Sequence, residues 1–386
     1  MRRIAILGST GSIGINTLDV IRRNPSVFKA VALSTNSNTG ILQRQIREFR
    51  PLFACINDLN SARGVGSVFK STVKILSGAN QLLDMLADRR IDRVVLAISG
   101  SAALPPLLKA IESGKDVALA NKEALVMAGP LIMRLAAKNK VKILPIDSEQ
   151  SAIWQCLEGQ DRPKLKEIYL TASGGPFLNL EKKQFKNITP RQALAHPRWK
   201  MGRKISVDSA TLMNKGLELL EAMYLFGVAP EKIKILIHPE SIVHSMVEYV
   251  DGSVIAQLSV TDMRIPIQYA LSYPERLPAP AAFKALDFYR LKTLNFAKPD
   301  FKKFPCLKLA YQAACDGGTT PCVLNAANEV SVSEFLKRRL RFTFIPLVIE
   351  KVLARHRNIK NPGLKDILAA DNWARRQASN IINKYD

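Results

Sequence analysis

The feature that most constrains the fold is the alternation of short apolar runs with helical stretches over the first 147 residues. The apolar runs have the length and the β-branched content of strands, and helical periodicity follows them. Parallel strands need such crossover helices, so the alternation predicts a parallel sheet covered by helices. The predicted strands are Arg3–Leu7, Ala30–Ser34, Phe53–Asn57, Val73–Leu76, Arg93–Ala97, Asp116–Leu119 and Lys142–Ile146.

The pattern changes after Asp147, where a long irregular segment rich in Gly, Pro and Lys runs from Ser173 to about Arg203. Loops of this length are uncommon in compact domains unless they act as lids or binding loops, so we expect a flap here. The helices and strands expected on either side of it, including a second sheet, are Ser151–Leu157, Glu167–Thr171, Ala210–Phe226, Lys234–Ile237, Ser245–Tyr249 and Val254–Ser259.

A segment with four prolines, from Tyr273 to Asp300, has the composition of a linker. The clearest helices after it are Leu307–Cys315, Ala326–Leu340 and Ile345–Arg355. The sequence therefore predicts an α/β protein with an N-terminal Rossmann-like parallel sheet, a central α/β domain with a flap loop, and a C-terminal helical bundle. The corresponding limits are 1–147, 148–272 with the flap at about 173–203, a linker at 273–299, and 300–386.

The chain carries 56 Lys and Arg against 33 Asp and Glu in 386 residues, which gives a formal net charge of +23. Such an excess favours anionic partners without choosing among nucleic acid, a membrane surface and phosphorylated small molecules. The basic residues are spread over the whole chain rather than concentrated on one face with interleaved aromatics. We therefore expect no nucleic acid partner.

Segments for export or membrane insertion are not expected. The apolar run Ile4–Gly8 is too short for a secretory signal, and no stretch reaches the roughly 18 apolar residues of a membrane span. We therefore expect a soluble, cytoplasmic protein without a membrane partner. The five cysteines are scattered without a CxxC pair, which favours buried reduced thiols over disulfides or a zinc site.

Three glycines stand between the first predicted strand and the first helix, in the run GSTGSIG at 8–14. Glycines there let the backbone approach a pyrophosphate, and the helix N-terminus supplies free N–H groups; the alternative is a turn without a ligand. The second predicted strand leads into 34–38, which lacks the carboxylate that binds a free ribose 2′-hydroxyl. Its hydroxyl and amide donors favour NADPH over NADH. The alternative interpretation of these residues is a polar turn unrelated to any cofactor.

Two carboxylates, Asp147 and Glu149, stand at the end of the seventh predicted strand. Ligands collect at the carboxyl ends of parallel strands, and carboxylate oxygens suit Mg²⁺ or Mn²⁺. With four histidines in the chain, a His-rich zinc site is not expected. The alternative for these residues is a helix N-cap followed by an acidic first turn.

A second group of polar side chains follows the flap, between Gly202 and Glu218. Ser209, Asn214 and Lys215 are donors of the type that holds a phosphate or a polyol, and Glu218 follows one helical turn after Asn214. A solvated helix start contains the same residue types. Their number within ten residues favours a binding site.

Taken in order, these motifs resemble the 1-deoxy-D-xylulose 5-phosphate reductoisomerase family over essentially the whole chain. The matching motifs are GSTGSIG at 8–14, NKE at 121–123, DSE at 147–149, SGGPF at 173–177, HPRWKMG at 196–202, the helix start at 209–218, HPESIVHSM at 238–246, DMR at 262–264 and NAANEV at 325–330. The resemblance implies a homodimeric enzyme of non-mevalonate isoprenoid biosynthesis. With NADPH and a divalent metal, it would convert 1-deoxy-D-xylulose 5-phosphate into 2-C-methyl-D-erythritol 4-phosphate.

The resemblance also assigns roles to individual residues. The catalytic residues would be Lys122, Glu149 and His196, and the ligands of Mg²⁺ or Mn²⁺ would be Asp147, Glu149 and Glu218. The substrate would contact Lys122, Ser148, Glu149, Ser173, His196, Ser209, Asn214, Lys215 and Glu218, covered by Trp199 and Met201 of the flap. NADPH would contact Thr10, Gly11, Ser12, Ile13, Asn36, Ser37, Asn38, Asn121, Glu123 and Gly202.

The chemistry that the resemblance implies is a metal-assisted rearrangement followed by hydride transfer. Glu149 would exchange protons with substrate hydroxyls, and Lys122 would stabilise oxyanion character. The rearrangement has two alternative mechanisms, retro-aldol cleavage with re-addition and an α-ketol shift, and the sequence does not choose between them. A dehydrogenase without isomerase activity is the rival interpretation, and it would not need the three-carboxylate metal site.

Four positions depart from the family pattern: Ser37 replaces a Lys, Ala124 a Ser, Gln150 a His and Thr261 a Pro. None of them removes a metal ligand. Ser37 exchanges a charge for a hydroxyl, which weakens the expected preference for NADPH over NADH. Gln150 can donate and accept hydrogen bonds but cannot titrate.

Overall fold

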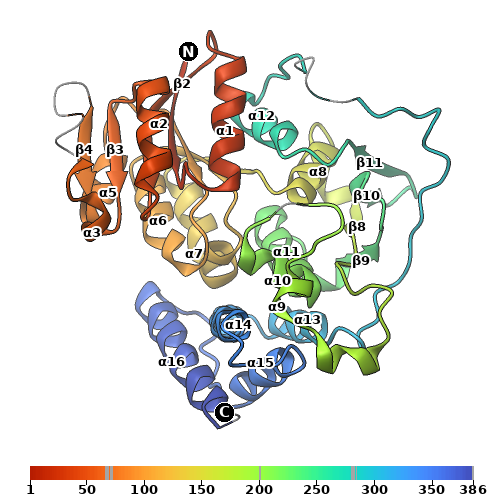
Figure 1. Ribbon diagram of the computed structural model, residues 1–386. Coiled ribbons are helices and arrows are strands. Elements are labelled where there is room, and N and C mark those ends of the chain that lie inside the picture. Colours follow the sequence, from red (N-terminus) through yellow and green to blue (C-terminus); the bar gives the residue numbers. More distant parts are fainter. Residues whose placement is uncertain (66–68, 70–72, 200, 280–282, 284, 385–386) are drawn as a thin grey trace. The chain divides into compact units, whose positions relative to one another are not determined.

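The computed structural model describes residues 1–65, 69, 73–199, 201–279, 283 and 285–384, and it divides into two compact units (Figure 1). Lys200 of the predicted flap, 280–282 and 284 of the predicted linker, and the last two residues lie outside this part. The first unit comprises Met1–Ala124, Ile132–Ser151 and Asp262–Lys284. The second comprises Leu125–Leu131, Ala152–Thr261 and Ala285–Asp386. The domain limits drawn from the sequence stay predictions.

The first unit is built on a seven-stranded parallel sheet in the order β4-β3-β2-β1-β5-β6-β7. Its strands are β1 Arg2–Leu7, β2 Phe28–Thr35, β3 Phe53–Ile56, β4 Lys74–Ser77, β5 Arg93–Leu96, β6 Asp116–Leu119 and β7 Ile143–Pro145. Strand order reverses at β1, whose neighbours are β2 and β5, and this is the place where ligands bind in doubly wound sheets. All seven predicted strands are confirmed, with ends shifted by at most two residues.

Helices cover both faces of this sheet, so its central strands are apolar throughout (Figure 1). In β1, Ile4, Ala5, Ile6 and Leu7 are fully buried. The helices of this part of the chain are α1 Ser12–Arg23, α2 Thr39–Phe49, α3 Leu59–Ala62, α5 Gly78–Leu86, η1 Ser101–Ala103, α6 Leu104–Glu112, α7 Glu123–Lys138, α8 Ser148–Leu157 and α12 Arg264–Ser272. The last residues of α8 already belong to the second unit.

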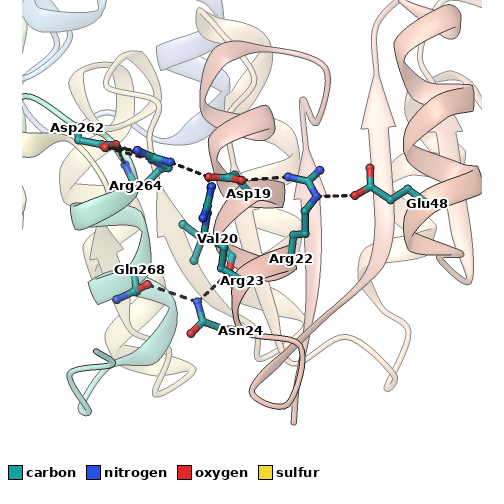
Figure 2. A network of polar contacts seen from close by, with 9 residues as sticks. All are labelled: Asp19, Val20, Arg22, Arg23, Asn24, Glu48, Asp262, Arg264 and Gln268. Atoms are coloured by element: carbon teal, nitrogen blue, oxygen red, sulfur yellow. Dashed lines mark hydrogen bonds and ion pairs between the residues drawn. The ribbon is translucent and has the colours of Figure 1, made fainter. Parts of the chain in front are cut away.

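Helix α12 returns to the first unit from far along the sequence and attaches to α1 (Figure 2). Arg264 donates to both oxygens of Asp262 and, at 2.9 Å, to Asp19 Oδ2 on α1. Burial raises the pKa of the Asp262 carboxyl, but the hydrogen bonds and charge of Arg264 outweigh burial and leave this pKa below its usual value. The DMR motif at 262–264 is therefore a structural anchor in this unit.

The second unit contains a four-stranded mixed sheet in the order β11-β10-β8-β9. Its strands are β8 Leu165–Ala172, β9 Ile233–Ile237, β10 Val243–Tyr249 and β11 Val254–Leu258. Strands β8 and β9 are parallel, whereas β10 runs antiparallel to both β8 and β11. The predicted second sheet is thus confirmed.

The helices of the second unit form one apolar core with this sheet. They are η2 Arg162–Lys164, η3 Lys182–Asn187, α9 Pro190–Ala193, α10 Arg203–Ala210, α11 Met213–Phe226, η4 Pro230–Lys232, α13 Pro305–Asp316, α14 Thr320–Leu336, α15 Phe344–Ala354 and α16 Leu364–Ile382. Helix α14 is buried on most of its circumference because α13, α15 and α16 pack around it (Figure 1). The predicted C-terminal helical bundle is confirmed.

Two helix predictions need correction, and one helix was not predicted. The predicted helix Ala210–Phe226 is interrupted, because Leu212 has a left-handed φ of 59° and α11 begins only at the next residue. Helix α14 begins at Thr320, before the expected Ala326, since Pro321 is tolerated in a first helical turn. The sequence reading missed α16 entirely.

Within the predicted flap, η3 and α9 provide short helical turns with a capping box each, so the segment is ordered locally. The five cysteines are free thiols; four are buried, as expected, but Cys315 is exposed. No helix in the described residues is long and apolar enough to cross a membrane.

Candidate active site

The turn from β1 into α1 is restricted to glycine at two positions, one in the loop and one in the first turn of the helix. Gly8 has a φ of +88°, and a Cβ there would lie 2.6 Å from the Ala97 carbonyl oxygen. A Cβ on Gly14 would lie 2.4 Å from the Gly8 carbonyl oxygen. The N-cap residue of α1 is Gly11, which has no side chain to cap the first-turn N–H groups. These N–H groups and the positive end of the helix dipole suit a phosphate.

The end of β2 carries the polar residues that the sequence associates with the cofactor ribose. Thr10 Oγ1 lies 2.7 Å from Thr35 Oγ1, which joins the glycine turn to the end of this strand. Asn38 Oδ1 accepts a backbone N–H in the first turn of α2 at 3.2 Å, so it caps that helix. The side chains of Asn36 and Ser37 are exposed. This edge therefore offers amide and hydroxyl groups next to the turn.

Asn121, at the carboxyl end of β6, organises the start of α7. Its Nδ2 donates to the carbonyls of Ile98 and Gly100 and to the Glu123 carboxylate, and its Oδ1 accepts from Ala124 N at 2.8 Å. Because all these groups are protein atoms, the Asn121 side chain fixes the loop after β5 against the helix start.

The carboxyl ends of the neighbouring strands β6 and β7 bring two motifs together. Lys122 Nζ lies 2.7 Å from Asp147 Oδ1, and their side chains are only 6% and 12% exposed. Next to them, the Ser148 hydroxyl donates to the Glu149 carboxylate. The first unit thus presents two carboxylates and a buried ammonium at the end of its sheet.

In the second unit, the corner between α10 and α11 collects the phosphate-type donors. Ser209 lies in the last turn of α10, and Asn214 and Lys215 lie in the first turn of α11. Both Asn214 Nδ2 and Lys215 Nζ donate to the Glu218 carboxylate. Lys215 and Glu218 are nearly completely buried, which strengthens their mutual attraction.

The predicted flap begins with a contact between two of the predicted substrate residues. Ser173 Oγ and His196 Nε2 are 3.1 Å apart, and His196 Nδ1 accepts the backbone N–H groups of Arg198 and Trp199. An imidazole nitrogen that accepts hydrogen bonds carries no proton, so we assign the proton of the neutral ring to Nε2, which donates to Ser173.

The SGGPF turn lies directly against the end of α10. Gly175 has a φ of +69°, and a Cβ there would lie 2.6 Å from the Ser209 carbonyl oxygen. The structure therefore brings Ser173, His196 and Ser209 into one neighbourhood. Of the remaining flap residues, Trp199 has its ring centroid 6.5 Å from that of His244. Met201 is half-buried. Gly202 is the exposed N-cap residue of α10.

His238 and His244 are buried groups with protein partners. His238 Nε2 accepts the backbone N–H groups of Ile242 and Val243 at 3.2 Å, and its Nδ1 lies 2.8 Å from the Asn295 carbonyl. His244 Nε2 lies 3.2 Å from a backbone carbonyl of the same unit.

The four departures from the family pattern fall in two kinds of surroundings. Ala124 and Gln150 are completely buried, whereas Ser37 and Thr261 are exposed. The buried pair lies in α7 and α8, each next to a predicted site residue. The exposed pair lies in loops, where a side chain of another size fits without repacking.

The sequence reading missed one buried network, formed by Lys204, Asp208 and Asn328. Asp208 directly precedes Ser209. Its side chain is buried, which is why it needs polar partners, and this burial is visible only in the structure. The NAANEV motif contained Asn328, but the sequence assigned it no role.

Comparison with protein families places this architecture in a known class. A doubly wound parallel sheet with a glycine-rich turn, followed by a cluster of carboxylates and phosphate-type donors, fits the class of NADPH-dependent oxidoreductases. Residues 4–129 match the 1-deoxy-D-xylulose 5-phosphate reductoisomerase family, 143–226 match the C-terminal domain model of that reductoisomerase, and 258–377 match a DXP reductoisomerase C-terminal domain. The chain belongs to the 1-deoxy-D-xylulose 5-phosphate reductoisomerase family.

Individual relatives support the same membership over full length. The reductoisomerase of Caldanaerobacter subterraneus subsp. tengcongensis is 50% identical over 385 residues, covering 100% of both chains. The Zymomonas mobilis enzyme, solved in complex with NADPH, has a TM-score of 0.91 and 41% identity over 99% of both chains. A reductoisomerase solved with NADPH, fosmidomycin and magnesium has a TM-score of 0.92 and 42% identity, covering 99% of this chain and 98% of that one.

Proposed function

We propose that this protein is a 1-deoxy-D-xylulose 5-phosphate reductoisomerase that uses NADPH and Mg²⁺ or Mn²⁺. The product is 2-C-methyl-D-erythritol 4-phosphate of the non-mevalonate isoprenoid pathway. The observation that carries the proposal is the full-length match to relatives of this name. The motif residues of this chain lie at the carboxyl end of the first sheet and at the α10–α11 corner, where they are buried or half-buried.

The glycine turn fits the pyrophosphate of NADPH, because Gly8 and Gly14 leave no room for a side chain. NADPH supplies a hydride to the aldehyde that the rearrangement yields. Thr10, Gly11, Ser12 and Ile13 would bind the pyrophosphate through the turn and the start of α1. Asn36, Ser37 and Asn38 would meet the ribose side, and Asn121, Glu123 and Gly202 the remainder of the cofactor.

The donors proposed for the metal are the oxygens of Asp147, Glu149 and Glu218, which fit Mg²⁺ or Mn²⁺ because these are hard cations. When bound, the metal polarises the carbonyl and hydroxyl oxygens of the substrate. The carboxylates have cationic or hydroxylic partners in their own units: Lys122 contacts Asp147, Ser148 contacts Glu149, and Lys215 contacts Glu218. These partners orient the carboxylates.

Three residues would act on the reacting atoms. Glu149 accepts and returns protons of the substrate hydroxyls, while Lys122 offsets negative charge that develops on their oxygens. His196, with its proton on Nε2, donates a hydrogen bond towards Ser173 or the substrate.

Phosphate binding is assigned to Ser173, Ser209, Asn214 and Lys215. Remote binding energy of this kind can close a flap over the substrate, with Trp199 and Met201 as its cover. The choice between retro-aldol cleavage and an α-ketol shift stays open.

We propose a homodimer as the functional assembly, and a cytoplasmic location stays a prediction of the sequence. Strand β11 is at the edge of its sheet, and Val250, Val254 and Ile255 beside or on it are 62%, 50% and 37% exposed. An apolar edge strand is a natural interface for a second copy of the chain. Sedimentation analysis should give a dimer that Val254→Lys with Ile255→Lys converts to a monomer; a wild-type monomer contradicts this assembly.

NADPH oxidation in the presence of 1-deoxy-D-xylulose 5-phosphate tests the proposed function. We expect turnover with Mg²⁺ or Mn²⁺, none with chelator, and 2-C-methyl-D-erythritol 4-phosphate as the product detected by mass spectrometry. Absence of turnover with metal present would refute the reductoisomerase assignment. Turnover that continues in chelator would leave a dehydrogenase without the metal site as the better interpretation.

A further inference from the structure

The NAANEV motif at 325–330 lies in the middle of α14, and none of its residues is assigned to the reaction. Asn325 and Asn328 are completely buried in this helix. Burying an amide costs free energy unless hydrogen bonds compensate, so each asparagine needs polar partners within the core. The two asparagines have different partners, and only the hydrogen bond of Asn328 leads to the α10–α11 corner.

Asn328 contacts the helix that carries Ser209. Its Nδ2 donates to Asp208 Oδ1 at 2.8 Å, and the side chain of Asp208 is 1% exposed. The other carboxylate oxygen lies 2.8 Å from Lys204 Nζ, one turn earlier in α10. Both oxygens of this buried carboxylate are therefore held, one from α14 and one from α10.

Asp208 in turn belongs to the corner that joins α10 to α11. Its carbonyl accepts the Thr211 hydroxyl at 3.1 Å, and Thr211 Oγ1 accepts Met213 N at 3.3 Å. Between them, Leu212 holds a φ of 59°, which costs free energy in a residue with a Cβ. A strained corner keeps its shape only if the surrounding contacts determine it.

We propose that Asn328 is a positioning residue: through Asp208 it fixes the α10–α11 corner in the geometry that binds the substrate phosphate. The inference rests on the proposed function, since the phosphate donors Ser209, Asn214 and Lys215 come from that assignment. Without the amide of Asn328, Oδ1 of Asp208 loses its hydrogen bond from α14 and the corner relaxes. The phosphate donors on either side of Leu212 then lose their mutual spacing, and phosphate affinity falls.

Asn325 provides a matched control on the same helix. It has the same side chain and the same burial, but its Nδ2 donates at 3.1 Å to Glu329, which pairs with Arg375 of α16 at 2.7 Å. These hydrogen bonds connect α14 to α16 and not to α10. Asn325→Leu therefore removes a buried amide from the same core without touching Asp208.

The experiment compares wild type, Asn328→Leu, Asn328→Asp and Asn325→Leu. For each, KM is measured for 1-deoxy-D-xylulose 5-phosphate and for NADPH, and the affinity for inorganic phosphate is measured by calorimetry without turnover. Both Asn328 variants should raise the substrate KM and the phosphate Kd by about tenfold or more, since a hydrogen bond to a charged group is lost. The NADPH KM should stay within twofold of wild type, as should all three constants in Asn325→Leu.

Two results would overturn the inference. One is an Asn328→Leu protein with unchanged NADPH KM whose substrate KM and phosphate Kd also stay within twofold of wild type. The other is an equal loss of substrate and phosphate affinity in Asn325→Leu, which would show that both asparagines act only through packing in the core. If the wild type shows no turnover, the proposed function fails, and the phosphate Kd of the same four proteins still decides the role of Asn328.

Discussion

Lys122 Nζ lies 2.7 Å from Asp147 Oδ1, a buried ion pair between the NKE and DSE motifs at the ends of adjacent strands. One partner is assigned to the reaction and the other to the metal. The pair fixes the orientation of a carboxylate that solvent would otherwise reorient. Its position at the end of a parallel sheet explains why two motifs 25 residues apart act together.

Lys122→Met should abolish most activity, because the substrate loses a cation and Asp147 loses a buried counter-charge. Removal of one partner of a buried pair costs about 3–5 kcal/mol, so we also expect a lower thermal unfolding midpoint. The measurements are kcat with NADPH and the melting temperature. Lys138→Met, an exposed lysine at the end of the same helix, is the control and should change neither. Wild-type kcat in Lys122→Met contradicts the assigned role.

Glu218→Gln tests the third proposed metal ligand. An amide preserves the size of the side chain and one of the two acceptor oxygens that Asn214 and Lys215 use, but it removes the negative charge that a divalent cation needs. Titration with Mn²⁺ should show an affinity at least about tenfold weaker, with kcat reduced in parallel. The exposed Glu350→Gln serves as control. Unchanged Mn²⁺ affinity would remove Glu218 from the ligand set.

Gly14→Ala tests the cofactor turn, because the added Cβ would lie 2.4 Å from the Gly8 carbonyl oxygen and displace the backbone. NADPH affinity should fall by about tenfold or more, measured by fluorescence titration. Gly40→Ala is the matched control, since a Cβ there meets nothing within 4 Å and alanine has a higher helix propensity. Equal NADPH affinity in both variants would show that the glycine turn does not bind the cofactor.

The Asp19–Arg264–Asp262 cluster predicts a specific pH dependence of stability (Figure 2). For both carboxyls burial raises the pKa, but the arginine contacts outweigh it and leave the pKa below the usual value. The stability that they contribute is therefore complete above the unfolded-state pKa of about 4 and is lost as pH falls below it.

Arg264→Leu should remove this contribution. Its unfolding midpoint should be lower than wild type at pH 7, and the difference should shrink as pH falls from 5 towards 3. Differential scanning fluorimetry along this pH series measures both. A pH-independent difference would mean that Arg264 stabilises by packing on Phe283 rather than by charge.

Much of the fold could be predicted from sequence because local rules produce it. The central strands of the first sheet are buried on both faces, so each one contains a continuous apolar run. By contrast, the break at Leu212 left no trace in the apolar periodicity of 210–226, because a bulky residue in the left-handed region is imposed by tertiary contacts. Helix α16 was missed although it completes the bundle around α14.

For the site, the sequence by itself determined which chemical groups are present, in which order, and at which strand ends. Motif spacing reflects chain connectivity, so GSTGSIG, NKE and DSE are legible without coordinates. Only the tertiary structure decided that Lys122 pairs with Asp147 and that Asn328 reaches Asp208 from 120 residues away. These are contacts between elements distant in sequence, and burial makes them strong; neither property is written in any local stretch of residues.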